Sequence, residues 1–276
     1  LERGIAELPD APELLTPLAD IYAEQGDFER VQEAIKKLEV RRDASAQVSY
    51  LRGRMLMKQG HWSEALTTFE ALRTDTLAMQ NLSAQLNLLI AACCEHRGER
   101  AAQVDALKRI LTADPQHLSA RVALANVYLN AGDFDAALKE TQLAARSPFA
   151  SPSVRLSYAN LRLLRAKLQT LPTEEWDSLR TYLSQLHAEN KQLLEPIVAL
   201  AELEALRGNW TEATKILRDE TAKRPTDVRL RVSLALLLAR SQGTLAGLEA
   251  LSEAQLAIGD NVELRLTRAR MWCEDC

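Results

Sequence analysis

The most constraining feature of this chain is a set of interior glycines at nearly constant spacing: Gly26, Gly60, Gly98, Gly132, Gly208 and Gly243. Successive gaps are 34, 38, 34, 76 and 35 residues, and 76 is twice 38. Each glycine ends an apolar stretch of helical period and precedes a short turn. Glycine is favoured just past a helix end because the left-handed backbone conformation costs it nothing. The spacing therefore predicts a repeated helix–turn–helix unit, and repeats of this length are typical of solenoids.

Other positions follow the same period. Two residues after the glycine a bulky side chain is usual, and Trp176, in the unit without a glycine, stands 34 residues before Trp210. The position between glycine and bulky residue is expected to cap the next helix, through Asp27, Asp133, Asn209 and Thr244. Five residues after the glycine, a small residue that lets two helices approach closely is present as Ala65, Ala137 and Ala213.

The clearest unit reads LSARVALANVYLNAGDFDAALKETQLAARSP, residues 118–148. This unit resembles the tetratricopeptide repeat, whose signature positions are occupied by Leu124, Ala125, Tyr128, Gly132, Ala137 and Ala144. Gly53, Gly60, Ala65 and Phe69 match the same pattern in the second unit. The resemblance implies an all-α fold: a right-handed α-α superhelical solenoid of helix–turn–helix repeats.

The period divides the chain into one array. The predicted repeats are 12–45, 46–83, 84–117, 118–151, 152–193, 194–228 and 229–261, with partial repeats at 1–11 and 262–276. Residues 150–193 fit least well, because Pro172 in LQTLPTEEW replaces the glycine turn and Thr173 is expected to cap the next helix. This segment is either a repeat with a lengthened turn or a hinge between two sub-arrays. Neither end carries an obviously polar capping helix, so we expect a fragment of a longer chain that can self-associate through its ends.

Composition and motifs exclude several functions. The net charge of −4 argues against nucleic-acid binding. No apolar run reaches the length of a membrane helix, so any membrane contact is expected only through regions outside this sequence. Phosphate-loop, zinc-protease and nucleophile-elbow patterns are absent. Cys93, Cys94, Cys273 and Cys276 are too few for a disulfide scaffold and form no paired zinc pattern. We therefore expect no catalytic residue, metal, cofactor or small-molecule substrate.

The resemblance places a partner-binding stripe on the first helix of each repeat, facing a concave groove. In family register this stripe carries Tyr50, Arg54, Met57, Lys58, Gln85, His96, Asn126, Asn130 and Asn160. Asn126 and Asn160 are 34 residues apart and occupy equivalent places. Such a pair is a candidate clamp for a partner's backbone, since each amide both donates and accepts. The alternative is that these asparagines are solvated residues on an exposed stripe.

Two patterns of charged residues bear on which partners the groove could bind. Repeats that bind acidic chaperone tails need a lysine four residues before the first asparagine, where this chain has Val122, and cations on the third helix, where it has Glu195. Tail binding of that kind is therefore disfavoured from Asn126. Arg155, Arg162 and Arg165 form a candidate basic patch for an acidic or phosphorylated segment. The alternative is an ordinary solvated charged face.

The sequence thus predicts a non-catalytic scaffold or adaptor, of bacterial origin, that binds a partner polypeptide in its groove. The alternative is that the array is one arm of a larger cell-envelope or polysaccharide-export machine, or of a multidomain enzyme. A cytoplasmic location is expected, or a periplasmic one if a signal peptide precedes Leu1.

Overall fold

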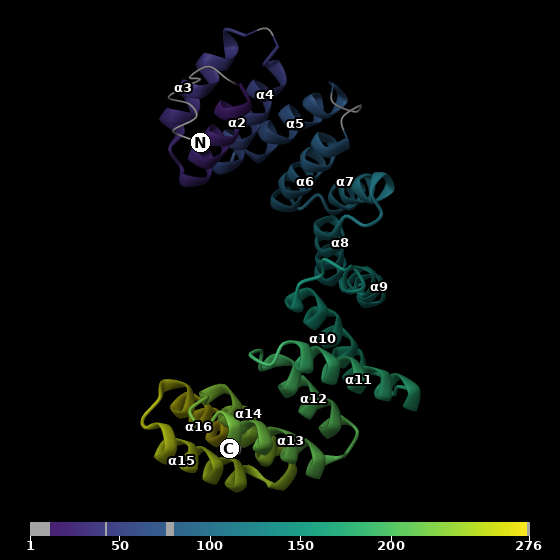
Figure 1. Cartoon of the computed structure of the whole chain (residues 1–276), viewed down its shortest axis with the longest axis vertical. Coiled ribbons are helices and arrows are strands. Elements are labelled where there is room, and N and C mark those ends of the chain that lie inside the picture. The colour runs from purple at the N-terminus through teal and green to yellow at the C-terminus, as the bar shows by residue number, and fades with distance from the viewer. Residues whose placement is uncertain (1–11, 42, 76–79, 275–276) are drawn as a thin grey trace. The chain divides into compact units, whose positions relative to one another are not determined.

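The computed structural model describes residues 12–41, 43–75 and 80–274, and α-helices are the only regular elements within them (Figure 1). The predicted partial repeat 1–11 lies outside the described residues. The chain divides into two compact units, Leu1–Glu140 and Thr141–Cys276. We call them unit 1 and unit 2 and describe each by itself.

Unit 1 is a stack of antiparallel helix pairs. Its helices are α2 (Pro12–Gln25), α3 (Phe28–Glu39), α4 (Ser45–Lys58), α5 (Trp62–Asp75), α6 (Gln80–Arg97), α7 (Arg100–Ala113), α8 (Leu118–Asn130) and the first part of α9 (Phe134–Ala145). Each predicted repeat here contains one first helix, one turn and one second helix. The predicted boundary at residue 84 differs from the structure, because no glycine or proline precedes it and α6 already begins at Gln80.

Unit 2 continues with the rest of α9 and further pairs. Its helices are α10 (Pro152–Leu168), α11 (Thr173–Glu189), α12 (Glu195–Leu206), α13 (Trp210–Lys223), α14 (Val228–Gln242), α15 (Thr244–Ile258) and α16 (Val262–Glu274). The poorly matching segment forms the pair α10 and α11, each 17 residues long. The expected cap at Thr173 is wrong: Pro172 takes the cap position and Thr173 is the first helical residue.

The turns explain why glycine marks the period. All six predicted glycines have a positive φ, between +73° and +99°, which confirms the left-handed conformation. Asp27 and Asp133 cap the following helices, each accepting from a backbone amide three residues on, at 3.2 and 3.1 Å. The other two positions differ from the prediction. Asn209 holds the N-cap position of α13 but donates its side-chain amide to Glu204 at 2.8 Å, and Thr244 is already helical, with Gly243 before it.

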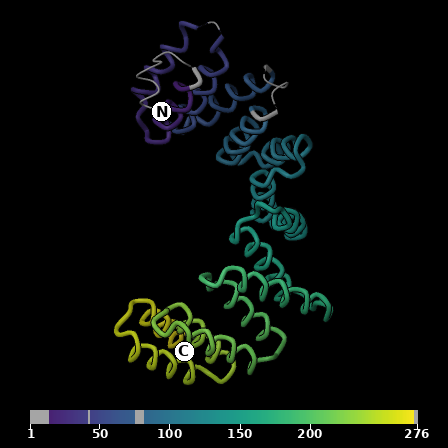
Figure 2. Tube along the Cα trace, in the orientation of Figure 1, coloured from purple at the N-terminus to yellow at the C-terminus, as the bar shows by residue number. Residues whose placement is uncertain are grey.

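Small residues bring paired helices together. Ala65, Ala137 and Ala213 are fully buried, as the period predicted. At Gly53, an added Cβ would lie 2.5 Å from Cε1 of Phe69, so only glycine lets α4 approach α5 this closely. The trace in Figure 2 shows α14, α15 and α16 lying side by side in the same manner at the end of unit 2.

First helices of successive repeats also contact each other directly: α2 packs on α4 in unit 1, and α10 on α12, α12 on α14 and α14 on α16 in unit 2. Second helices of successive repeats make no comparably extensive contact among the described residues. In these pairs the first helices approach more closely than the second helices do, as expected of the inner wall of a curved repeat stack.

Candidate functional site

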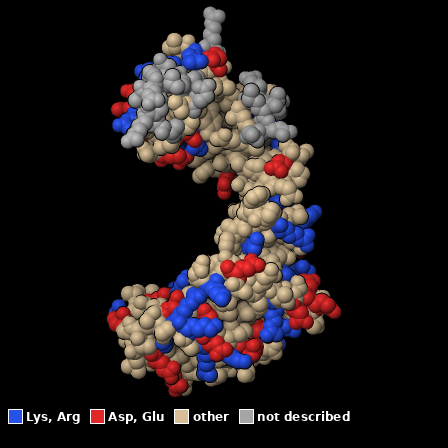
Figure 3. Space-filling model, viewed as in Figure 1, with Lys and Arg blue, Asp and Glu red and all other residues tan. Residues whose placement is uncertain are grey.

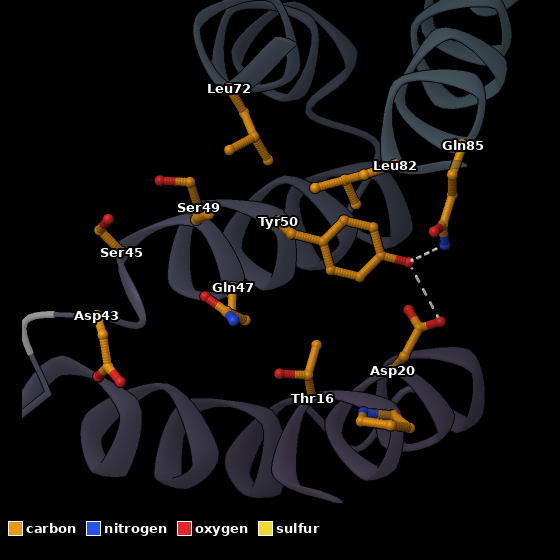
Figure 4. Close-up of a pocket in the computed structure, with 12 residues that line it drawn as sticks. Thr16, Asp20, Asp43, Ser45, Gln47, Ser49, Tyr50, Leu72, Leu82 and Gln85 are labelled. Carbon is orange, nitrogen blue, oxygen red and sulfur yellow. Dashed lines mark hydrogen bonds between the residues drawn. The ribbon is translucent and has the colours of Figure 1, made fainter. Parts of the chain in front are cut away.

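Three first helices of unit 1 are joined by a chain of side-chain hydrogen bonds (Figure 4). The Tyr50 hydroxyl on α4 donates to Asp20 Oδ2 on α2 at 3.4 Å, and Gln85 Nε2 on α6 donates to the Tyr50 hydroxyl at 2.8 Å. Tyr50 is only 7% exposed. Burial, with the nearby Asp20 carboxylate, raises the pKa of Tyr50 to about 12. The phenol therefore stays protonated at neutral pH and acts as a hydrogen-bonding link.

Beside this chain, two cations of α4 meet two carboxylates of α2. Arg54 Nε donates to Asp20 Oδ1 at 2.6 Å, and a second Arg54 nitrogen binds Glu24. Lys58 Nζ donates to Glu24 Oε2 at 2.6 Å. The hydrogen bond from Lys58, helped by Arg54, lowers the pKa of Glu24. The part of the predicted binding stripe that carries Arg54 and Lys58 is therefore occupied by ion pairs within the chain.

A cavity of about 690 Å³ opens next to the Tyr50 chain. Its walls come from α2, the turn before α4, α4 itself, the end of α5 and the start of α6. Two polar atoms at this cavity, Thr16 Oγ1 on α2 and Gln47 Oε1 on α4, are buried and have no hydrogen-bond partner among the described residues. Figure 4 shows both side chains projecting into the space between the two helices. Because an unpaired buried polar group is costly, this cavity is the candidate site.

The sequence pattern of the tetratricopeptide repeat matches residues 16–81, 50–117 and 95–161, together more than half of the chain. The chain belongs to the tetratricopeptide repeat family. The candidate site therefore lies on the first helices of successive tetratricopeptide repeats. No curated protein sequence matches the chain.

Solved structures of tetratricopeptide proteins share the fold at low sequence identity. A tetratricopeptide repeat protein from Parabacteroides merdae is 16% identical with a TM-score of 0.51, over 95% of this chain and 98% of that one. The C-terminal part of a repeat-containing protein from Cytophaga hutchinsonii is 11% identical with a TM-score of 0.63, over 91% and 98%. A MamA protein is 14% identical with a TM-score of 0.50, over 68% and 94%. At these identities the likeness shows the fold alone.

The predicted binding stripe of the tetratricopeptide array is only partly brought together. Tyr50, Arg54, Lys58 and Gln85 lie in the connected cluster just described. Met57 instead packs against the core of unit 1. His96 stacks on Trp62 of the preceding repeat, with ring centroids 3.8 Å apart and planes 7° from parallel. Arg54, predicted to face the groove, has a side chain that is 14% exposed and bound to Asp20 and Glu24 of α2, and its part in partner binding stays a prediction.

The predicted asparagines are exposed on their helices. Asn126 and Asn130 lie on α8 in unit 1, whereas Asn160 lies on α10 in unit 2. Because the two helices belong to different units, the asparagine clamp stays a prediction.

Each arginine of the predicted basic patch has a partner within its own repeat. Arg155 pairs with Glu189 at 2.9 Å, and Arg165 with Glu175 at 3.8 Å. Arg162 donates to the Glu175 backbone carbonyl at 3.1 Å and lies over the Tyr158 ring. All three guanidinium groups thus contact partners in their own repeat, with two carboxylates against three positive charges, and binding of an acidic segment here stays a prediction. Figure 3 shows the same mixing of Lys and Arg with Asp and Glu over this unit.

Sequence reasoning missed Thr16, Asp20, Glu24 and Gln47. Asp20 stands 34 residues before Arg54, and Glu24 stands 34 before Lys58. A search for opposite charges one repeat apart would have found these ion pairs. The cavity atoms Thr16 Oγ1 and Gln47 Oε1 have no such signal, because their importance lies in a lack of partners.

A second cavity in unit 1, of about 860 Å³, is a weaker candidate. Its main polar groups satisfy one another: Arg109 Nε donates to Asn87 Oδ1 at 2.8 Å, and Asn87 Nδ2 to the Ser83 carbonyl at 2.8 Å. Arg73 Nε pairs with Glu70 at 2.7 Å. A ligand here would have to replace existing bonds.

The described part of the chain was also considered for metal sites and membrane-spanning helices. Within it, no group of three or more histidine, cysteine, aspartate or glutamate side chains is placed to hold a metal ion. None of its helices combines the length and apolar character needed to cross a bilayer.

Proposed function

We propose that this tetratricopeptide array is a non-catalytic scaffold that binds an extended segment of a partner polypeptide along the first helices of unit 1. One residue of that segment enters the cavity between α2 and α4. The observation that carries the proposal is the pair of buried, unpartnered atoms, Thr16 Oγ1 and Gln47 Oε1, at a cavity open to this wall.

A buried polar group without a partner costs about 1–3 kcal/mol, and a ligand that supplies the missing hydrogen bonds recovers part of that cost. The surrounding chain of Asp20, Tyr50 and Gln85 holds α2, α4 and α6 in register, so the cavity is formed before the partner arrives. A preformed site spends less conformational entropy on binding.

The test uses random decapeptides displayed on phage, selected against the whole chain. Selected peptides are then measured by fluorescence anisotropy against Thr16→Val and Gln47→Leu. The matched controls are Thr74→Val and Gln32→Leu, exposed residues on the second helices α5 and α3. We expect each cavity variant to weaken binding about tenfold, as loss of a hydrogen bond predicts, and the controls to bind like the parent chain.

Equal binding to cavity and control variants would refute the location of the site. Failure to select any peptide would count against the scaffold role itself. The alternative role, as one arm of a larger envelope machine or enzyme, stays a prediction from the sequence.

A further inference from the structure

We propose that the residue entering the α2–α4 cavity is a lysine or arginine of the partner, an inference that rests on the proposed function. The juxtaposition that supports it is a cavity lined by unpartnered acceptor atoms and carboxylates, with no lysine or arginine among the described residues that line it.

The unpaired atoms of the cavity call for hydrogen-bond donors. Gln47 Oε1 accepts only, and Thr16 Oγ1 can accept. A lysine ammonium carries three donors and no acceptor, and an arginine guanidinium carries five donors and no acceptor. Either group can satisfy both atoms at once. A partner carboxylate brings acceptors only and would leave Gln47 Oε1 unsatisfied.

The charges point the same way. Asp20 and Asp43 are the ionisable acids of the lining, and their cationic partners, Arg54 and Arg41, are not part of it. Asp20 Oδ1 binds Arg54 at 2.6 Å, but Oδ2 receives only the longer 3.4 Å bond from Tyr50. Its second oxygen therefore retains capacity for another donor. A cation entering the cavity therefore meets carboxylate oxygens, and the described lining residues include no cation.

The apolar part of the lining suits a long side chain. Pro17, Leu72 and Leu82 contribute aliphatic surface, and Leu72 itself is 4% exposed. Lysine and arginine carry methylene stems that pack on such surface while their charged ends reach polar groups. A short polar side chain would fill less of a cavity of about 690 Å³.

The experiment compares decapeptides selected against the parent chain with those selected against Gln47→Lys. We expect lysine or arginine to be enriched at one peptide position with the parent chain, and this enrichment to be lost with Gln47→Lys. Gln32→Lys on the exposed side of α3 is the matched charge control and should keep the enrichment. Thermal melts establish that each variant is folded.

A second arm keeps the test decisive if Gln47→Lys does not fold. In a selected peptide, the enriched residue is replaced by norleucine, glutamine or glutamate, and binding to the parent chain is measured by anisotropy. We expect norleucine to weaken binding about tenfold and glutamate to weaken it more, since charge-assisted hydrogen bonds are the stronger ones. Gln47→Glu should bind the cationic peptide more tightly and leave the norleucine peptide unchanged.

The outcomes separate the two proposals. Equal affinity of the norleucine or glutamine peptide, or enrichment of acidic residues at the anchor, would overturn the cationic side chain while the scaffold function stands. No selectable peptide at all would overturn the scaffold function first.

Discussion

Arg54 and Asp20 stand 34 residues apart, one repeat length, and Arg54 Nε lies 2.6 Å from Asp20 Oδ1. The same separation joins Lys58 to Glu24 and Arg229 to Glu195, each pair on the first helices of successive repeats. Neighbouring repeats are related by a nearly constant rotation and translation, so equivalent positions of successive first helices lie close together. Opposite charges at those positions reinforce the stack. The cation of each such pair is therefore engaged within the fold.

The Arg54 pair predicts a measurable loss of stability. Arg54→Ala should lower the free energy of unfolding by about 1–3 kcal/mol, because it leaves Asp20 with only the 3.4 Å bond from Tyr50 and Glu24 with Lys58 alone. Denaturant unfolding measures the change. Arg52→Ala is the control, since Arg52 is 55% exposed and its pair with Glu39 should contribute no more than about 0.5 kcal/mol. Equal losses for Arg52 and Arg54 would contradict the assignment.

Tyr50 predicts a pH dependence at the alkaline end. Its pKa is about 12 in the folded chain against 10.0 for an ordinary tyrosine, so the unfolded state loses its proton first as pH rises. The stabilising contribution is therefore complete below pH 10 and is lost between pH 10 and 12, at about 1.4 kcal/mol per pH unit. Stability of the parent chain and of Tyr50→Phe should be compared across this range. The stability difference between the two chains should fall steadily across this range, and a constant difference would argue against the shift.

Gly53 predicts a steric effect with a specific rescue. Gly53→Ala places a methyl group 2.5 Å from the Phe69 ring and should cost about 1–3 kcal/mol through overpacking. Phe69→Leu should recover part of that loss in the double variant, as a thermodynamic cycle would reveal. Gly60→Ala is the contrast: no atom lies within 4 Å of its added Cβ, and its strain comes from φ of +81°. Phe69→Leu should not rescue it.

Ala137 tests the register of the fourth repeat. This residue is fully buried, so Ala137→Leu should overpack the fourth repeat and lower stability by about 1–3 kcal/mol. Lys139→Leu, at an exposed position of the same helix, is the control and should change the melting temperature little. A thermal melt of Ala137→Leu that matches the parent chain would show that the repeat is out of register.

Several features followed from residues alone because they are local or repeated. A glycine with positive φ is required by the backbone of the turn, whatever surrounds it. Ala65, Ala137 and Ala213 could be placed in the core from their spacing, since a small side chain is what lets paired helices approach. The cap at Asp27 could also be predicted because it is local. Its carboxylate accepts from a backbone amide only three residues further along the chain.

Other features were decided only by packing. Asn209 had the right residue type for a cap, yet its amide is drawn to Glu204, a fully buried carboxylate that needs donors. Arg155 was predicted from the sequence to belong to a basic patch, and in the structure it pairs with Glu189 on the neighbouring helix. In both cases the sequence shows the side chain, but the partner depends on which helix lies next to it.

The sequence by itself therefore determined the period, the helical hairpin and the stacking of repeats, because backbone conformation and small-residue packing repeat with the chain. The tertiary structure decided which polar groups are already paired and which are left over. Thr16 and Gln47 became a candidate site only when α2 and α4 enclosed them without supplying partners, and hydrogen-bond satisfaction is a property of the assembled neighbours.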